Sequence, residues 1–430
     1  MDHKKLGLFS IILLGINAII GSGIFLLPNQ AYSLVGNASL IIILFDALLV
    51  ISIALCFAEA SSLFKTNGGP YVYAKEAFGN FIGFEVGFIK WIVSMIAWAT
   101  MANGFATALG QVVPVTAERH WQIIIMTSII VILSALNLIG VNETKWLNNI
   151  VTIGKLIPLI LFVLIGIFYI KGANLTADPV HLTTSNFGKG AILLFYAFTG
   201  FESIAVAAED MEKPQKNIPK AIIIAMALVS VFYFLIQLVA IGVLGAHLAD
   251  YKAPIQQAME TFMGKFGLYL VAAGTLISIG GINIAGSFIT PRSAVALADD
   301  GLLPQFMKKK SANGVPYWSI IITGALTLPI ALSGSFTTLA AISVVSRFAQ
   351  YLPTILSIIV FRKTKADVKR SFKIPFGITI PIIATITSIL LLTQAEPKQL
   401  ILGFGGLILA IPFYFVMRYI DKREAQKDKK

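Results

Sequence analysis

Ionisable residues stand inside several strongly apolar stretches of this 430-residue chain. Lys155 lies in the sequence TIGKLIPLILF, with no carboxylate three or four positions away, where a helix would place an ion-pair partner. Glu202 follows Gly200 in the sequence FYAFTGFESIAV. Burial in an apolar medium disfavours the charged form of such groups. Lys155 and Glu202 are therefore candidates for proton exchange, with Lys155 the stronger of the two.

Two glycine-containing interruptions accompany these charges. Residues 19–25 read IIGSGIF, and residues 198–203 read FTGFES. Glycine in a helix interior costs about 1 kcal/mol relative to alanine, and a broken helix in lipid needs a cavity or ligand to satisfy its backbone. N–H groups released at the first break suit a carboxylate, and they belong to Gly21, Ser22 and Gly23. Released carbonyl groups suit an ammonium, and they belong to Ile19, Tyr196 and Thr199.

Close helix packing is the alternative explanation for a single Gly-Ser-Gly, because small residues let membrane helices approach one another. Two interruptions at corresponding places in two halves of the chain favour a binding site instead. Glycine is suited to such a site because it lets the backbone, rather than a side chain, face the ligand.

Composition places the chain in a membrane. It is 57% hydrophobic and 13% charged, whereas soluble domains are roughly 45–50% apolar and about 25% charged. The net charge of +12 comes from Lys and Arg residues that lie between apolar runs. This distribution is typical of loops that orient a chain in a lipid bilayer, and it does not indicate a nucleic-acid partner. Cys56 is the only cysteine, so no intrachain disulfide forms. The pattern suggests neither a metal nor another cofactor.

The apolar runs predict an all-α membrane protein with twelve transmembrane helices. Of the 33 Lys and Arg residues, 24 fall on the side of the termini and six on the other side, so we expect both termini in the cytoplasm of a cell (inner) membrane protein. The expected spans are 7–28, 36–58, 81–108, 121–141, 147–170, 187–209, 219–244, 266–291, 317–333, 337–360, 376–394 and 399–419.

The interruptions fall in spans 1 and 6, which are five spans apart. An odd separation gives a unit and its copy opposite orientations, which is the signature of inverted repeats with discontinuous helices at the binding site. We therefore expect one transporter domain over 1–430. Its first repeat covers about 7–170, its second about 187–360, and additional helices about 376–419.

Four motifs make the chain similar to the amino acid–polyamine–organocation (APC) superfamily of transporters. They are GINAIIGSGIFLLP, TNGGPYVYAKEAFG, FTGFESIAVAAEDMEKPQKNIPKAI and ISIGGINIAGSFITPRSAVALADDGLLP, and the resemblance covers about residues 6–375. It implies a leucine-transporter-like five-plus-five inverted repeat. It also implies an α-carboxylate site at Ser22 and Gly23, with Gly21 allowing the break. The implied α-ammonium site consists of the carbonyls of Ile19, Tyr196 and Thr199, with Tyr196 as an aromatic gate.

One departure bears on the substrate. Arginine–agmatine exchangers carry a tryptophan after the Gly-Gly of span 8, where this chain has Ile282. An aliphatic wall favours a small or medium neutral side chain over a guanidinium. The resemblance also implies that the ammonium of Lys155 replaces a coupling cation. The alternative for Lys155 is a structural cation that never loses its proton.

Several roles stay open. Three roles are open for Glu202: gating through hydrogen bonds to span 1 or 8, carrying a proton, or capping freed N–H groups. Asn283 is a candidate for a polar contact beside Ile282. Four further charges inside spans have no assigned role: Asp46, Glu85, Lys90 and Arg347. Aromatic candidates for the pathway are Trp91, Trp98 and Phe348.

We expect a secondary transporter, as a monomer or homodimer, with proton-coupled uptake of neutral amino acids and exchange as the alternative. An intramembrane enzyme is disfavoured because no histidine lies inside a span and neither an HExxH nor a GxSxG motif occurs. A channel is disfavoured because channels usually build a filter from repeated subunits. A transporter-like nutrient sensor is a less favoured alternative, because such sensors usually carry long cytoplasmic extensions.

Overall fold

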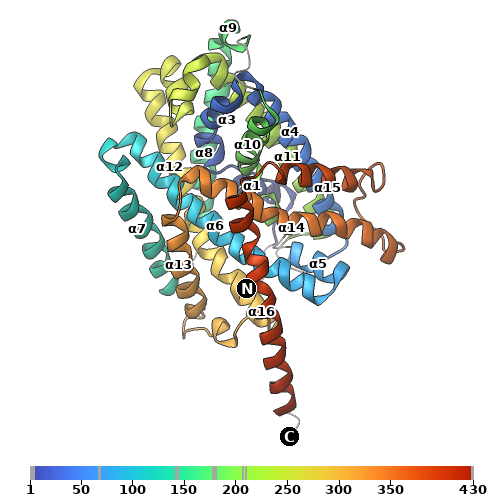
Figure 1. Cartoon of the computed structure of the whole chain (residues 1–430). Coiled ribbons are helices and arrows are strands. Elements are labelled where there is room, and N and C mark those ends of the chain that lie inside the picture. The colour runs from blue at the N-terminus through green and yellow to red at the C-terminus, as the bar shows by residue number, and fades with distance from the viewer. Residues whose placement is uncertain are drawn as a thin grey trace.

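The computed structural model describes residues 5–65, 69–140, 145–176, 182–205, 208 and 211–427 of the chain. In these ranges the protein is built from helices, joined by turns and one isolated bridge between Leu6 and Met211 (Figure 1). The expectation of an all-helical protein is therefore confirmed for the described chain.

The first predicted span is divided into two helices, α1 and α2, and other elements of the first half follow in chain order. Their bounds are α1 Leu8–Ile19, α2 Gly23–Leu26, α3 Pro28–Val35, α4 Ser39–Ser61, α5 Pro70–Phe78, α6 Asn80–Val112, η2 Pro114–Ala117, α7 Arg119–Leu138 and α8 Lys145–Gly166.

The sixth predicted span is also divided, into α10 and two short 3₁₀ turns, η4 and η5. The bounds in the second half are α10 Thr184–Phe195, η4 Tyr196–Phe198, η5 Phe201–Ala205, α11 Pro214–Leu244, α12 Pro254–Asp299, α13 Tyr317–Leu332, α14 Phe336–Thr364, α15 Thr379–Leu392 and α16 Pro397–Lys427.

Nine segments of the described chain are long and apolar enough to cross a membrane, and α13 and α15 are shorter apolar helices. The sixth predicted span does not reach that length as one helix, because α10 ends at Phe195 before the break. Length and composition therefore support a multi-pass membrane protein.

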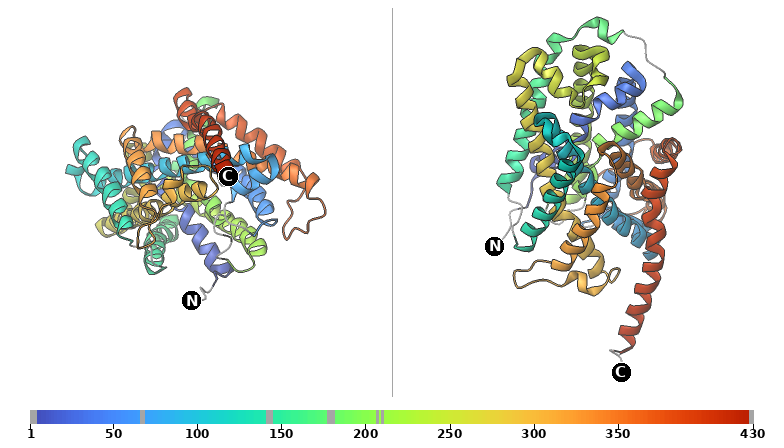
Figure 2. Two further views of the ribbon diagram at one scale, coloured as in Figure 1. Left: turned by 90° about the horizontal axis from the view of Figure 1, so that it is seen from below. Right: turned by 60° about the vertical axis from the view of Figure 1, so that its left-hand side comes forward.

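Several boundaries differ from those expected. The first span is predicted to end at residue 28, but Pro28 begins α3, where its missing N–H costs nothing. α12 begins at Pro254 and bends at Gly264, whose φ is 61°, before the predicted start of span 8. The last span is predicted to end at residue 419, but α16 continues to Lys427, and Figures 1 and 2 show this helix leaving the bundle.

Small residues set the distance between α8 and α12. A Cβ atom on Gly274 would lie 2.4 Å from Pro158, and one on Gly281 would lie 2.3 Å from Val151. Membrane helices gain stability from close van der Waals contact of this kind, since lipid supplies little hydrophobic drive between them. The packing brings the face of α8 that carries Lys155 against α12.

An ion-pair cluster joins α4 to the end of α14. The buried carboxylate of Glu59 accepts hydrogen bonds from Arg362 Nε at 3.0 Å and Nη2 at 2.6 Å. It also accepts one from the backbone N–H of Ile374 at 2.8 Å, and Arg370 Nε lies 3.5 Å away. The bidentate geometry fixes the chain after α14 against α4.

Candidate functional site

The two interrupted segments lie directly against each other. A Cβ atom on Gly200 would lie 2.4 Å from the carbonyl oxygen of Ala18, and one on Gly23 would lie 2.7 Å from the Cα of Ala197. Gly200 also has a φ of 112°, which L side chains rarely adopt. Glycine is therefore required at both positions for the α1–α2 break to meet the η4–η5 break.

Three consecutive N–H groups at the first break have no backbone acceptor in the described chain. Ile20 ends α1 with an extended ψ of 97°, and α2 begins at Gly23. In the described chain the N–H groups of Gly21, Ser22 and Gly23 donate to no carbonyl. The first N–H groups of a helix have no intrahelical acceptor and carry a partial positive charge. This arrangement can receive a carboxylate.

Two of the expected ammonium acceptors already accept hydrogen bonds inside the protein. The carbonyl of Tyr196 accepts from Thr199 through its N–H at 3.2 Å and its Oγ1 at 2.8 Å. The carbonyl of Ile19 accepts from Tyr233 Oη at 3.4 Å. A carbonyl oxygen has two lone pairs, so that of Ile19 keeps capacity for a ligand while that of Tyr196 is fully used.

Side chains from α6 and α12 close over Gly21. A Cβ on Gly21 would lie 3.0 Å from Ile282 Cδ1 and 3.2 Å from Met101 Cε. The hydroxyl of Ser22 donates to the sulfur of Met101 at 3.4 Å and lies 3.4 Å from Tyr196 Oη. Ile282 thus lies beside the break, next to the backbone of Gly21.

Sequence analysis missed Met101 and Phe336. The ring of Phe336 packs edge-on against Tyr196, with 5.9 Å between centroids, and lies 3.2 Å from where a Cβ on Gly104 would be. Neither residue type is unusual in an apolar helix, so the sequence carried no signal. Both were placed at the break by the packing of α6 and α14.

The break is closed from solvent. Ser22 is fully buried, and 3% of Tyr196 and 7% of Thr199 are exposed. Tyr196 thus has Ser22 on one side and Phe336 on the other. A substrate would have to displace this packing, so the structure represents a closed arrangement of the site.

Lys155 reaches the same break from α8. Its Nζ donates to the carbonyl oxygens of Asn17 and Ile20, both at 2.6 Å, and its side chain is fully buried. Ser278 Oγ lies 3.5 Å from the carbonyl of Ile20. Among the described ion pairs none involves Lys155, so carbonyl dipoles alone hold the ammonium.

Glu202 joins the second break to α14 rather than to span 1 or 8. Its carboxylate pairs with Arg347, and its Oε2 accepts from Tyr351 Oη at 3.0 Å. The same oxygen accepts from the N–H of Gly200 at 2.9 Å, which is the geometry of capping, one of the three roles left open for this residue. The structure thus supplies the partner of Arg347 that sequence alone left unidentified.

The remaining charged candidates lie in α4 and α6. Asp46 is fully buried in α4, and neither carboxylate oxygen has a hydrogen-bond partner. Glu85 is buried in α6 with Oε1 unpartnered, and Lys90 is half-buried nearby in the same helix. The described residues contain no group of three His, Cys, Asp or Glu suited to a metal ion.

The three aromatic candidates are packed in the protein. Trp91 Nε1 donates to Thr323 Oγ1 at 3.2 Å, and Trp98 is 2% exposed. Phe348 packs against Phe195, with ring centroids 5.2 Å apart. Their contacts bind helices together rather than line an open passage.

Comparison with known proteins gives a match along nearly the whole chain. A family model described as "Amino acid permease" matches residues 6–416. An uncharacterized transporter of Mycobacterium tuberculosis is 33% identical over 97% of this chain and 92% of its own. The methylthioribose transporter of Bacillus subtilis is 28% identical, over 89% and 86%. The serine/threonine exchanger SteT of Bacillus subtilis is 25% identical, over 98% of each chain.

Proposed function

The chain belongs to the amino acid permease family, and we propose that it takes up small or medium neutral amino acids across the cell membrane, coupled to protons. The amino acid would bind between the two helix breaks. Its carboxylate would accept from the N–H groups of Gly21, Ser22 and Gly23, and its ammonium would donate to the carbonyls of Ile19 and Thr199. Gly200 would provide the close approach of the two breaks.

Apolar side chains support a neutral substrate. Met101 and Ile282 lie against Gly21, and Phe336 packs on Tyr196. None of these three offers a charge to a lysine, arginine or carboxylate side chain of a substrate. Desolvating such a charge without a partner would cost several kcal/mol, so an uncharged side chain is favoured.

The contact between Lys155 and Ile20 carries the proposal of proton coupling. The ammonium satisfies carbonyls at the C-terminal end of α1, immediately before the N–H groups proposed for the substrate. Loss of the proton would remove one positive charge and replace two charge-assisted hydrogen bonds to these carbonyls by weaker ones from a neutral amine. Protonation of Lys155 would thus favour the closed arrangement of α1, α8 and α12, and deprotonation would favour its opening.

Gating is proposed for Tyr196 and Glu202. Tyr196 contacts Ser22 across the break, and Glu202 ties the following turn to Arg347 of α14. Both contacts must change if substrate is to pass between α1 and η4. We further propose twelve spans in a five-plus-five inverted repeat, with both termini cytoplasmic, because the two broken segments meet as paired halves of such a fold.

Transport by purified protein in liposomes tests the proposal. Uptake of radiolabelled neutral amino acids into empty vesicles should rise when an inward proton gradient is imposed. In Lys155→Ala, whatever uptake remains should be insensitive to the gradient. Absence of uptake for every amino acid in the panel, with the protein folded, would contradict the proposed function.

Exchange is the second candidate, because a serine/threonine exchanger is similar along 98% of this chain. The same vesicles distinguish it. Uptake that requires internal amino acid and ignores the proton gradient would make the protein an exchanger and Lys155 a structural cation.

A further inference from the structure

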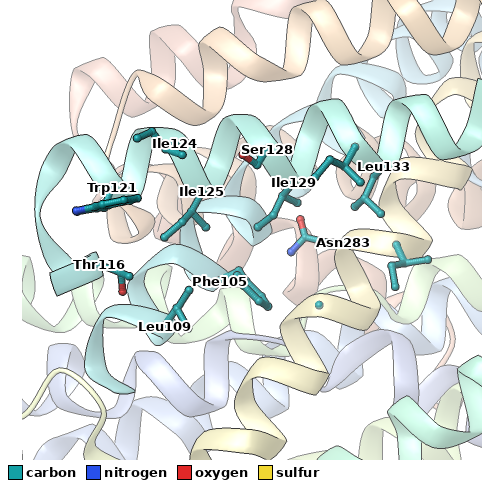
Figure 3. A pocket seen from close by; sticks show the side chains of 13 residues that line it. Phe105, Leu109, Thr116, Trp121, Ile124, Ile125, Ser128, Ile129, Leu133 and Asn283 are labelled. Carbon is teal, nitrogen blue, oxygen red and sulfur yellow. The ribbon is translucent and has the colours of Figure 1, made fainter. Parts of the chain in front are cut away.

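A groove of about 490 Å³ lies between α6, α7 and α12 (Figure 3). Its lining is almost entirely apolar, and α7 contributes Trp121, Ile125 and Ile129 to one wall. The volume falls within the range of roughly 300–1,000 Å³ typical of small-molecule sites. From Trp121 to Leu133 the wall spans twelve residues of helix, or roughly 18 Å.

The groove opens on an apolar outer face of a helix long and apolar enough to cross a membrane, so we infer that it faces lipid. Ile124 and Ile132, which line it, are 49% and 56% exposed, and Trp121 at one end is 39% exposed. α7 is a peripheral helix, at the left edge of Figure 1, and leaves apolar side chains on its outer face. A molecule reaching this groove would therefore enter from the hydrocarbon phase.

One buried polar group is directed into the groove. Asn283 is 1% exposed, and Figure 3 shows its side chain among the apolar lining residues. Its Nδ2 donates to the carbonyl of Ile279 at 2.9 Å, whereas its Oδ1 has no hydrogen-bond partner. Buried acceptors are nearly always satisfied, so an unpartnered amide oxygen at a cavity wall calls for a donor.

The groove is distinct from the proposed amino acid site. Phe105 lines it from α6, while Met101, one helical turn earlier, contacts Gly21. On α12 Asn283 faces the groove, while the preceding Ile282 lies against Gly21. No described residue lines both sites, but on α6 the groove and the break are one turn apart on the same face, so the two sites are neighbours rather than one cavity.

We propose that this groove binds a membrane-dissolved long-chain alcohol, with the hydroxyl donating to Asn283 Oδ1 and the alkyl chain lying along α7. Hydrocarbon offers a hydroxyl no acceptor away from the headgroups, so Asn283 supplies the acceptor that the polar end of the molecule needs at the depth of the groove. The apolar walls contribute shape complementarity but little net free energy of binding, because the alkyl chain leaves one apolar medium for another. Asn283 is therefore the group that makes the site selective.

Photolabelling of the full chain in lipid nanodiscs tests this site. The probe is an octanol that carries a diazirine on its alkyl chain, and the matched probe is its methyl ether, which cannot donate. Labelled peptides are then located by mass spectrometry. We expect the alcohol to label α7 and α12. The ether should label them roughly three- to tenfold less, because it loses the free energy of one net hydrogen bond.

Three variants complete the test. Asn283→Leu removes the acceptor at nearly constant size and should reduce labelling by the alcohol to the level of the ether. Ile129→Trp fills the groove and should reduce labelling by both probes, whereas Val131→Trp, at a 53% exposed position of α7 outside the groove, should leave it unchanged. The melting temperature of each variant confirms folding.

Equal labelling by the two probes, or equal labelling of the wild type and Asn283→Leu, would overturn the proposal. Labelling spread evenly over lipid-exposed helices, and insensitive to Ile129→Trp, would also overturn it. Because no transport is measured, these outcomes are independent of the function proposed for the helix breaks.

Discussion

A Cβ atom on Gly200 would lie 2.4 Å from the carbonyl oxygen of Ala18, so the broken segments meet where no side chain fits. Gly200→Ala should abolish transport and destabilise the fold. The strained φ of 112° alone costs roughly 1–3 kcal/mol, and the clash with backbone adds to it. Thermal unfolding of the purified variant measures the loss.

Gly405→Ala is the control for that change, because a Cβ at Gly405 meets nothing within 4 Å. It should unfold at the wild-type temperature or slightly above it, since alanine favours a helix by about 1 kcal/mol over glycine. Equal stability of Gly200→Ala and the wild type would mean that the two breaks do not meet as described.

Lys155→Gln tests whether Lys155 carries a proton during transport or serves only as a structural hydrogen-bond donor. Glutamine can still donate to the carbonyls of Asn17 or Ile20, but it cannot lose a proton at working pH. We expect amino acid binding to persist while the stimulation of uptake by an inward proton gradient disappears. Binding by scintillation proximity and uptake by filtration measure the two properties on one preparation.

Unchanged gradient stimulation in Lys155→Gln would exclude this lysine as the coupling group. Loss of binding together with uptake would instead point to the ammonium as a structural support of the α1 break. Melting temperatures of the variant distinguish that result from simple misfolding.

Removing the charge of Glu202 should cost more stability than removing the hydrogen bond that Glu202 accepts from Tyr351. Glu202→Gln leaves the guanidinium of Arg347 buried without its counter-ion, which costs about 3–5 kcal/mol when a buried pair is broken. Tyr351→Phe removes one hydrogen bond to Glu202 and should cost only about 1–2 kcal/mol.

A double variant, Glu202→Gln with Arg347→Met, tests whether that cost is electrostatic. It should recover much of the stability lost in Glu202→Gln, because the unpaired charge is gone. Additive losses in the double variant would show that the two side chains do not interact. Thermal unfolding of the wild type, the single variants Glu202→Gln and Arg347→Met, and the double variant forms the cycle.

Ile282→Ala should widen substrate choice. Ile282 Cδ1 lies 3.0 Å from where a Cβ on Gly21 would be, so shortening the side chain opens space beside the proposed site. Competition assays should show that larger neutral amino acids inhibit uptake more strongly than in the wild type. The expected gain in their affinity is roughly ten- to a hundredfold. Ile277→Ala, half-exposed on the same helix, is the matched control and should leave the profile unchanged.

Much of this fold could be predicted because lipid constrains sequence locally. Long apolar runs identify helices without any tertiary contact, and the glycines of IIGSGIF and FTGFES marked both breaks, since helix interiors select against glycine. The contact of the two breaks at Gly200 and Ala18 agrees with their corresponding positions in the two halves of the chain.

The partners of the buried charges were decided only by tertiary structure. Glu202 and Arg347 are separated by 145 residues, and Glu59 and Arg362 by 303, so no local pattern joins them. Met101 likewise reached Gly21 because α6 packs across the break. Sequence determined which segments are helical and where they break, because those preferences are local. Helix packing decided which side chains meet, because that depends on contacts between distant parts of the chain.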